Sequence, residues 1–224
     1  MGNIGRTITD CLYERPKDNW FVAELSSFQL ASTKKLHPHV AMLLNITPDH
    51  IEWHGSFEAY AAAKEKIFAN LDVHDLAIVS DLDEHCRAVS SRLEKRGITV
   101  CHLAEKDPKT SNAAFVQNGA LVVRLAGKEQ ELVSVEALQI KGLHNALNAL
   151  AAAACGLYLG IDPVSIRHAL LDFKPLEHRI EPVATINGVL YVNDSKATNT
   201  DSVEKSLVSF PKNDIVLLLG GHDK

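Results

Sequence analysis

Short apolar runs alternate with longer stretches of helical periodicity along the chain. Four runs of four or five mostly apolar residues predict strands that are buried on both faces, because neither face of such a run is polar. These runs are 21–25, 40–44, 76–79 and 98–101. Helices are predicted at 57–71, at 82–96 and at the Ala-rich segment 143–159. Strands that alternate with helices indicate βαβ units, so we expect an α/β fold with a mostly parallel sheet.

Two Asn-Gly pairs, at 118–119 and 187–188, predict antiparallel hairpins. Each pair lies between two β-rich runs, which is the strongest short-range signal for a hairpin. We expect a small antiparallel patch at 112–135 and a second hairpin at 181–193, and after it a helix near 200–208 and a strand at 215–219.

A change in composition at 172–182 predicts a domain boundary. The segment DFKPLEHRIEP carries two prolines and interrupts the periodic pattern. Linkers between domains commonly have this character. We therefore expect one domain over residues 1–175 and the beginning of another over residues 176–224.

Composition and charge narrow the class of protein. The 224 residues are 46% hydrophobic and 23% charged, the balance of a globular protein. A net charge of −5 provides no basic field for a phosphate backbone, which argues against nucleic acid as a partner. No apolar run approaches the roughly 20 residues of a membrane span, and the N-terminus lacks a signal-peptide layout. We expect a cytoplasmic, monomeric protein that does not insert into membranes. Its four scattered cysteines are interpreted as reduced thiols.

Lys64 is the first candidate for chemistry. On a helix that begins at Phe57, it falls in the middle of the apolar stripe, while Lys66 points to the opposite face. Burial lowers the pKa of a lysine, and the neutral amine can take up CO₂ as a carbamate. The alternative is a lysine that extends past the edge of the core to water.

Glu24 and His50 are predicted at the same edge of the sheet. Glu24 lies near the end of the apolar run 21–25, and His50 ends the sequence TPDH after the run 40–44. Ligands of open α/β sheets bind at the carboxyl ends of the strands, so these two side chains and Lys64 could converge there on a divalent cation. The alternatives are a helix cap at Ser26 or Ser27 and a turn with a capping Asp49.

A polar stripe begins the Ala-rich helix. His144, Asn145 and Asn148 share one face within the first two turns, near the positive end of the helix dipole. Amide groups there could hold a nucleotide base or phosphate. The alternative, an N-terminal cap at Asn145, explains only one of the three residues.

Two polar segments flank the hairpin at 181–193. Glu177, His178 and Arg179 precede it, and the run NDSKATN at 193–199 follows it. Asp194 suits a ribose hydroxyl, and Arg179 suits a phosphate or an adenine face. A solvated turn that caps the next helix is the alternative.

As a set, these motifs resemble the Mur ligase family, and within it the member that adds D-glutamate to UDP-N-acetylmuramoyl-L-alanine. They appear in the family's order along the whole chain, and GNIG with ELSSFQL favours that member. The motifs are GNIG (2–5), AELSSFQL (23–30), LNITPDH (44–50), YAAAKEKIF (60–68), GLHNALNALAA (142–152), LEHRIE (176–181), NDSKATN (193–199) and LLLGG (217–221).

The resemblance implies an ATP-dependent ligase of peptidoglycan synthesis with a P-loop-type central domain and a Rossmann-like C-terminal domain. ATP would activate the carboxylate of UDP-N-acetylmuramoyl-L-alanine as an acyl phosphate, which the amine of D-glutamate attacks. By the same resemblance, Glu24, His50 and a carbamylated Lys64 would hold Mg²⁺ or Mn²⁺. Residues expected at the ATP site are Asn145, Asn148, Arg179 and Asp194; those expected near the UDP-sugar are Asn3, Ser26 and Gln29; and those expected near D-glutamate are Lys196, Thr198 and Lys224.

The chain departs from the family in one respect, because it contains no G-x-x-x-x-G-K-[ST] phosphate loop. We therefore expect an internal fragment of a longer ligase that is inactive alone. Two alternatives stay open: a Mur ligase with a different amino-acid acceptor, and a non-catalytic binding module.

Overall fold

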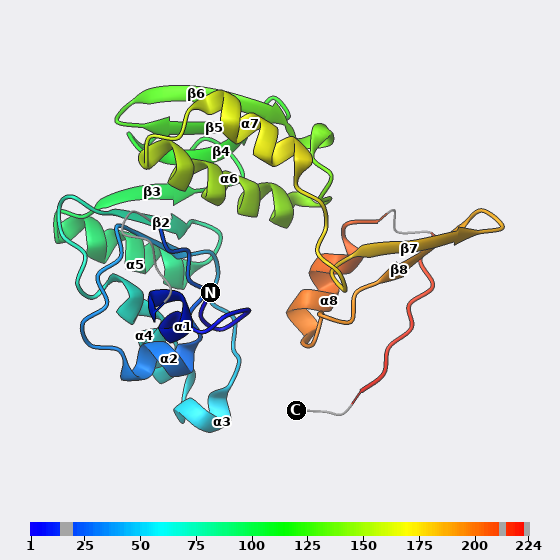
Figure 1. Ribbon diagram of the computed structural model, residues 1–224, viewed down its shortest axis with the longest axis horizontal. Coiled ribbons are helices and arrows are strands. Elements are labelled where there is room, and N and C mark those ends of the chain that lie inside the picture. The colour runs from blue at the N-terminus through cyan, green and yellow to red at the C-terminus, as the bar shows by residue number, and fades with distance from the viewer. Residues whose placement is uncertain (14–19, 211–213, 222–224) are drawn as a thin grey trace. The chain divides into compact units, whose positions relative to one another are not determined.

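The computed structural model describes residues 1–13, 20–210 and 214–221 (Figure 1). Contacts between Cα atoms divide the chain into two compact units, Met1–Val100 and Cys101–Lys224, and each is described by itself below.

The first unit consists of short helices and parallel strands. Its helices are α1 (Ile8–Tyr13), α2 (Ser27–Ser32), α3 (Ile51–His54), α4 (Phe57–Glu65), the 3₁₀ turn η1 (Lys66–Phe68) and α5 (Glu84–Lys95), and its strands are β1 (Val40–Leu43) and β2 (Leu76–Ser80). β1 and β2 pair in parallel, and both are rich in buried apolar side chains. Tyr60, Phe68 and Val89 pack with them in one core, so the apolar faces of α4, η1 and α5 are what hold these helices in place.

The second unit has an antiparallel patch covered by two helices. Its elements are β4 (Ala113–Gln117), β5 (Ala120–Leu125), β6 (Lys128–Ser134), η2 (Val135–Ala137), α6 (Leu143–Tyr158), α7 (Pro163–Asp172), β7 (Glu181–Ile186), β8 (Val189–Asn193) and α8 (Thr200–Leu207). α6 packs on β4 and β5, and α7 packs on β6 (Figure 1). β7 and β8 form a separate two-stranded sheet.

The strand order confirms the predicted α/β class. β1 to β6, with β3 at Thr99–Leu103, follow the order of the sequence in one six-stranded sheet. The pairs β1–β2 and β3–β4 are parallel, and β4–β5 and β5–β6 are antiparallel. Both Asn-Gly turns are confirmed, because all four of their residues have φ between 50° and 79°.

Two predicted strands are wrong. Residues 21–25 form only a single bridge, between Glu24 and Gly2, and Val22 is 84% exposed. Residues 215–219 have no strand partner in the described part of the chain, and Leu218 is 90% exposed. An apolar run becomes a strand only where a neighbouring strand pairs with it, and composition does not encode that neighbour.

The sequence analysis also missed helices, of which α7 is the longest. Asp162 caps α7 by accepting hydrogen bonds from the amides of Val164 and Ser165, and Pro163 occupies its first turn. A capping Asp followed by Pro is a known start signal for a helix, so this element could have been predicted.

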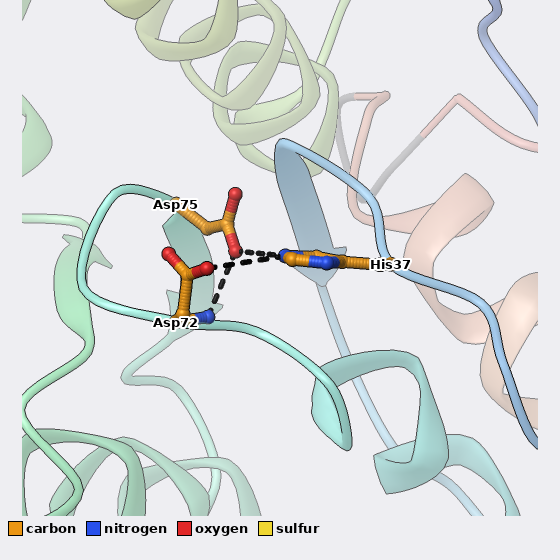
Figure 2. Close-up of side chains that lie close together, drawn as sticks. All are labelled: His37, Asp72 and Asp75. Carbon is orange, nitrogen blue, oxygen red and sulfur yellow. Dashed lines mark hydrogen bonds and ion pairs between the residues drawn. The ribbon is translucent and has the colours of Figure 1, made fainter.

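A charged link joins the segments that lead into β1 and β2 (Figure 2). Nε2 of His37 lies 2.6 Å from Oδ2 of Asp75, and the amide of Asp72 donates to the same oxygen at 2.8 Å. Burial acts to raise the pKa of Asp75, but these two hydrogen bonds outweigh it, so the pKa of Asp75 lies below its usual value. The ring of His37 and the amide of Asp72 both bond to the carboxylate of Asp75, so the cluster acts as a structural link between the two segments.

Asp75→Asn is expected to lower the free energy of unfolding by about 1–3 kcal/mol at pH 7, because it removes a buried, charge-assisted hydrogen bond. A carboxyl whose pKa is depressed by folding stabilises the protein above its unfolded pKa, and that stability is lost as the pH falls through the folded pKa. The variant should therefore lose less stability than the natural chain when urea melts are repeated below about pH 4. The matched control is Asp72→Asn, whose carboxyl is half exposed; an equal loss in both variants would contradict the link.

Two further expectations concern the cysteines and the membrane. Cys11, Cys86, Cys101 and Cys155 are all reduced thiols, as expected. Among the described residues, no helix combines the length and the apolar character that a membrane span requires.

Candidate active site

Glu24 is held in place by the first residues of the chain. The amide of Asn3 donates to the carbonyl of Glu24 at 2.8 Å, and the amide of Glu24 donates to the carbonyl of Met1 at 3.0 Å. Nδ2 of Asn3 donates to Oε1 of Glu24 at 3.1 Å. Glu24 is exposed, so the predicted buried position is wrong, and its carboxylate is free to face a ligand on its solvent side.

Gly2 allows this close approach. Its φ is +102°, and a Cβ atom at this position would lie 2.3 Å from the carbonyl oxygen of Glu24. We expect Gly2→Ala to separate the two segments, because the contact and the backbone strain together cost about 1–3 kcal/mol. Hydrogen exchange of the Glu24 amide should then accelerate. Gly5→Ala is the control: Gly5 also has a positive φ, but nothing lies within 4 Å of the added carbon. Equal acceleration in both variants would show that strain alone matters.

Ser26 and Gln29 form a capping box at the start of α2. The amide of Gln29 donates to Oγ of Ser26, and the amide of Ser26 donates to Oε1 of Gln29. The capping alternative for Ser26 is therefore confirmed. Both side chains lie at the amino end of α2, where their positions are fixed by each other.

His50 begins the short helix α3. Its φ is +53°, and its amide donates to Oδ1 of Asp49 at 2.9 Å. His50, not Asp49, is the N-cap residue of α3 and makes no side-chain cap bond, so the predicted cap at Asp49 is wrong. The segment follows β1, as expected. The side chain of His50 is 44% exposed, and its ring packs on Phe28 with 4.8 Å between centroids.

Lys64 is half-buried on α4, as its place in the apolar stripe predicts. Its ammonium lies 5.3 Å from the centroid of the buried Tyr60 ring. Burial lowers the pKa of Lys64, while the carboxylates of Asp49 and Glu24 act to raise it. The net decrease makes the neutral amine more abundant at neutral pH, and both carboxylates are near enough to Lys64 to act on its pKa.

The contrast with Lys66 supports this assignment. Lys66 is exposed, and its ammonium donates to the carbonyl oxygen of Ala31 on α2. Two lysines on one helical segment thus differ in burial and in partners, and the charge of Glu24, a candidate metal ligand, acts on Lys64.

The polar stripe of α6 has a different local role from the predicted cap. Gly142, not Asn145, is the N-cap residue, and it makes no side-chain bond. Nδ2 of Asn145 donates to the carbonyl of Lys141 at 2.7 Å, and Nδ2 of Asn148 lies 3.4 Å from Oδ1 of Asn145. A cavity of about 530 Å³ opens at this end of α6. Its lining residues are Val116, Asn118, Gly119, Ser134, Val135, Glu136, Gly142 and Leu143.

The segments that flank the β7–β8 hairpin are bonded to each other. Oδ1 of Asp194 accepts from the amide of Ile180 at 3.2 Å, and the amide of Lys196 donates to the carbonyl of His178 at 3.1 Å. Arg179, Lys196 and Thr198 are exposed. The predicted cap of the following helix is confirmed, because Oδ1 of Asn199 accepts from the amide of Ser202. Lys224 lies outside the described residues.

Charged side chains beside the β7–β8 hairpin affect the pKa of His144 at the start of α6. Burial lowers the pKa of His144, the charges of Lys205 and Arg179 lower it further, and that of Asp194 raises it. Arg179 and Asp194 are therefore close enough to the His144 stripe to act on it.

Residues that the sequence analysis did not select also contribute to the first unit's site. Asp49 acts on the pKa of both Lys64 and Tyr60, and Phe28 packs against the ring of His50. His54 was not predicted as part of the site. Its spacing of four residues from His50 places both on one side of a helical turn, and that signal was available.

Comparisons with known proteins show which family the chain is similar to. A sequence profile of the Mur ligase middle domain matches residues 7–156. The curated UDP-N-acetylmuramoylalanine--D-glutamate ligase of Koribacter versatilis is 41% identical over 223 residues, which are 100% of this chain and 48% of that protein. The ligase of the same name from Chelativorans sp. is 42% identical over 225 residues, 100% of this chain and 46% of that protein. The chain thus spans about half the length of the curated relatives it matches.

Solved structures with low sequence identity share the fold. MurF from Acinetobacter baumannii gives a TM-score of 0.61 at 20% identity, covering 84% of this chain and 42% of that one. A pseudomurein peptide ligase type C from Methanothermus fervidus gives 0.58 at 19% identity, covering 78% and 41%. Since the family profile matches well over half of its residues, the chain belongs to the Mur ligase family.

Proposed function

We propose that this chain is part of an ATP-dependent ligase that joins D-glutamate to UDP-N-acetylmuramoyl-L-alanine in peptidoglycan synthesis. The observation that carries the proposal is the half-buried Lys64, whose pKa is lowered by burial and is affected by the charges of Glu24 and Asp49. The chain that contains it is 41% identical to a relative named as a D-glutamate ligase. We further propose that residues 1–175 belong to the central ATPase domain and that residues 176–224 begin the C-terminal domain.

The first unit supplies donors that suit a divalent cation. Glu24 offers a carboxylate and His50 an imidazole, and a carbamate on Lys64 would add two oxygens, a set that suits Mg²⁺ or Mn²⁺. The uncharged amine of Lys64 would bond to the carbon of CO₂ and release one proton, which gives the carbamate. A bound cation would neutralise charge on transferring phosphoryl groups.

The second unit supplies polar groups that suit ATP. Asn145, Asn148, Arg179 and Asp194 are proposed to hold the nucleotide. The charges of Arg179 and Asp194, which act on His144 at the start of α6, support this placement. Arg179 is exposed and can pair with a phosphate or stack on adenine. The Asp194 carboxylate already accepts from the Ile180 amide, and its remaining lone pairs can accept from a ribose hydroxyl.

The remaining candidates are assigned to the acceptor and donor substrates. Asn3, Ser26 and Gln29 lie on the two segments that meet at Glu24 and α2, and we propose that they face the UDP-sugar. Lys196 and Thr198 are exposed beside the hairpin, and with Lys224 they are proposed to face D-glutamate. The lysines would pair with its carboxylates.

Phosphate release by the full-length ligase that carries this sequence tests the proposal. With ATP, Mg²⁺ and UDP-N-acetylmuramoyl-L-alanine present, release should depend on D-glutamate and not on L-glutamate, L-lysine, meso-diaminopimelate or D-alanyl-D-alanine. Dependence on another amino acid would support a Mur ligase with a different acceptor. Turnover that survives in Lys64→Ala at the natural rate would instead favour a non-catalytic role for this site.

A further inference from the structure

His54 is a half-buried histidine that joins three helices of the first unit. It ends α3, one turn after His50, and its amide donates to the carbonyl of His50 at 3.1 Å. Gly55 follows with φ +83°, and its amide donates to the carbonyl of Ile51 at 2.8 Å. The backbone of this single turn is therefore fixed at both ends, which fixes the direction of the His54 side chain.

The His54 ring contacts α2 and α4 at once. Nε2 lies 2.9 Å from Oγ of Ser27 on α2. The ring stacks on Phe28 of α2 with 5.7 Å between centroids and an angle of 21°, and it meets the Tyr60 ring of α4 edge to face at 5.4 Å. α2 and α4 are neighbours, and α3 packs on α4 (Figure 1). One imidazole thus lies where the three helices meet.

The hydrogen bond between His54 and Ser27 stabilises the beginning of α2, because Ser27 is buried there. It is a polar residue with only 4% of its surface exposed, and it directly follows the capping residue Ser26. A buried hydroxyl that loses its partner costs about 1–3 kcal/mol. The bond to His54 therefore holds the first turn of α2, the turn that carries Ser26 and Gln29.

Tyr60 gives the contact its importance for α4. The centroid of its buried ring lies 5.4 Å from the centroid of the His54 ring and 5.3 Å from the ammonium of Lys64. Movement of the His54 ring would therefore shift the Tyr60 ring, and with it the side of α4 that carries Lys64 one turn further along.

We propose that His54 is a positioning residue that fixes the Ser26–Gln29 turn of α2 relative to Lys64 through its hydrogen bond to Ser27. The proposal rests on the proposed function, in which Ser26 and Gln29 face the UDP-sugar and Lys64 belongs to the metal site. It assigns no contact between His54 and the reacting atoms.

Paired variants of the full-length ligase separate the hydrogen bond from the ring packing. His54→Phe keeps an aromatic ring but loses the bond, Ser27→Ala removes the bond from the other side, and His54→Gln keeps an amide that can reach Ser27. His168→Phe, at an exposed position on α7, is the matched control.

We expect His54→Phe and Ser27→Ala each to raise the KM for UDP-N-acetylmuramoyl-L-alanine about tenfold, the loss of one buried hydrogen bond. The KM for ATP should stay unchanged. The double variant should be no worse than either single variant, because both remove the same interaction. His54→Gln should restore most of the affinity, and His168→Phe should match the natural enzyme.

A purely structural role gives a different result. It would lower the amount of folded enzyme, and so lower kcat without a selective change in one KM. Additive effects in the double variant, or equal increases in the KM values for both substrates, would overturn the proposal.

Hydrogen exchange provides a test that does not depend on activity. The Gln29 and Leu30 amides of α2 should exchange faster in His54→Phe and Ser27→Ala by the same factor, while α7 amides stay as in the natural enzyme. If the natural enzyme shows no turnover with D-glutamate, the proposed function fails, and the exchange data still decide whether His54 positions α2. Unchanged exchange in α2 would refute that role.

Discussion

Lys64→Ala is expected to lower the kcat of the full-length ligase by on the order of a hundred- to a thousand-fold, the usual effect of losing one preorganised electrostatic contact to a transition state. The variant removes the amine on which the proposed carbamate forms, and with it a proposed cation ligand. The methyl group of Ala suits the apolar surroundings of this face of α4, so the fold should be retained. Phosphate release and a thermal melt, measured on the same preparation, check the two statements.

Lys66→Ala is the matched control for this experiment. Lys66 lies two residues further along the chain, is exposed, and bonds only to the Ala31 carbonyl among the contacts described above. Its removal should change kcat less than twofold, since surface contacts of this kind contribute little. Similar losses in both variants would place the effect in the helix as a whole and not in the Lys64 amine.

Changes to Glu24 and His50 should weaken cation binding rather than the fold. Glu24→Gln removes the negative charge that Asn3 orients, and His50→Ala removes an exposed imidazole. Each is expected to raise the Mg²⁺ concentration for half-maximal activity by about 10–100-fold, the range seen when groups that serve a metal site are replaced. Mg²⁺ titration of the activity, with Mn²⁺ binding followed by electron paramagnetic resonance, measures this constant.

Glu58→Gln controls for the general loss of a carboxylate. Glu58 is exposed in the first turn of α4 and is not among the groups that act on the pKa of Lys64. It should leave the Mg²⁺ constant unchanged. A normal Mg²⁺ constant in both Glu24→Gln and His50→Ala would remove these residues from the proposed metal site.

The sequence pattern predicted two kinds of element: turns that depend on the conformations of their own residues, and helices that bury one continuous apolar face. The apolar stripe of 57–71 gave both the helix and the half-buried place of Lys64, because a period of 3.6 residues determines which side chains face the core. The Asn-Gly turns at 118–119 and 187–188 were predictable for a similar reason, since Asn and Gly accept positive φ at low cost.

Contacts between distant segments were beyond this reasoning. The bond from Asn3 to Glu24 spans 21 positions, and that from His54 to Ser27 spans 27. The apolar composition of 21–25 predicts a buried strand, whereas the single bridge between Glu24 and Gly2 is a tertiary contact that composition does not encode. The residue types of the site were thus predictable, but the contacts that orient them were not.

The proposed metal site requires a carbamate on Lys64, and this modification can be observed by carbon-13 magnetic resonance of the full-length ligase in ¹³C-bicarbonate with ¹⁵N-labelled lysine. We expect a carbamate carbon coupled to one lysine nitrogen, present in Lys66→Ala, absent in Lys64→Ala, and broadened when Mn²⁺ is added. A carbamate signal that persists in Lys64→Ala, or no signal in the natural enzyme, would show that Lys64 does not carry the group.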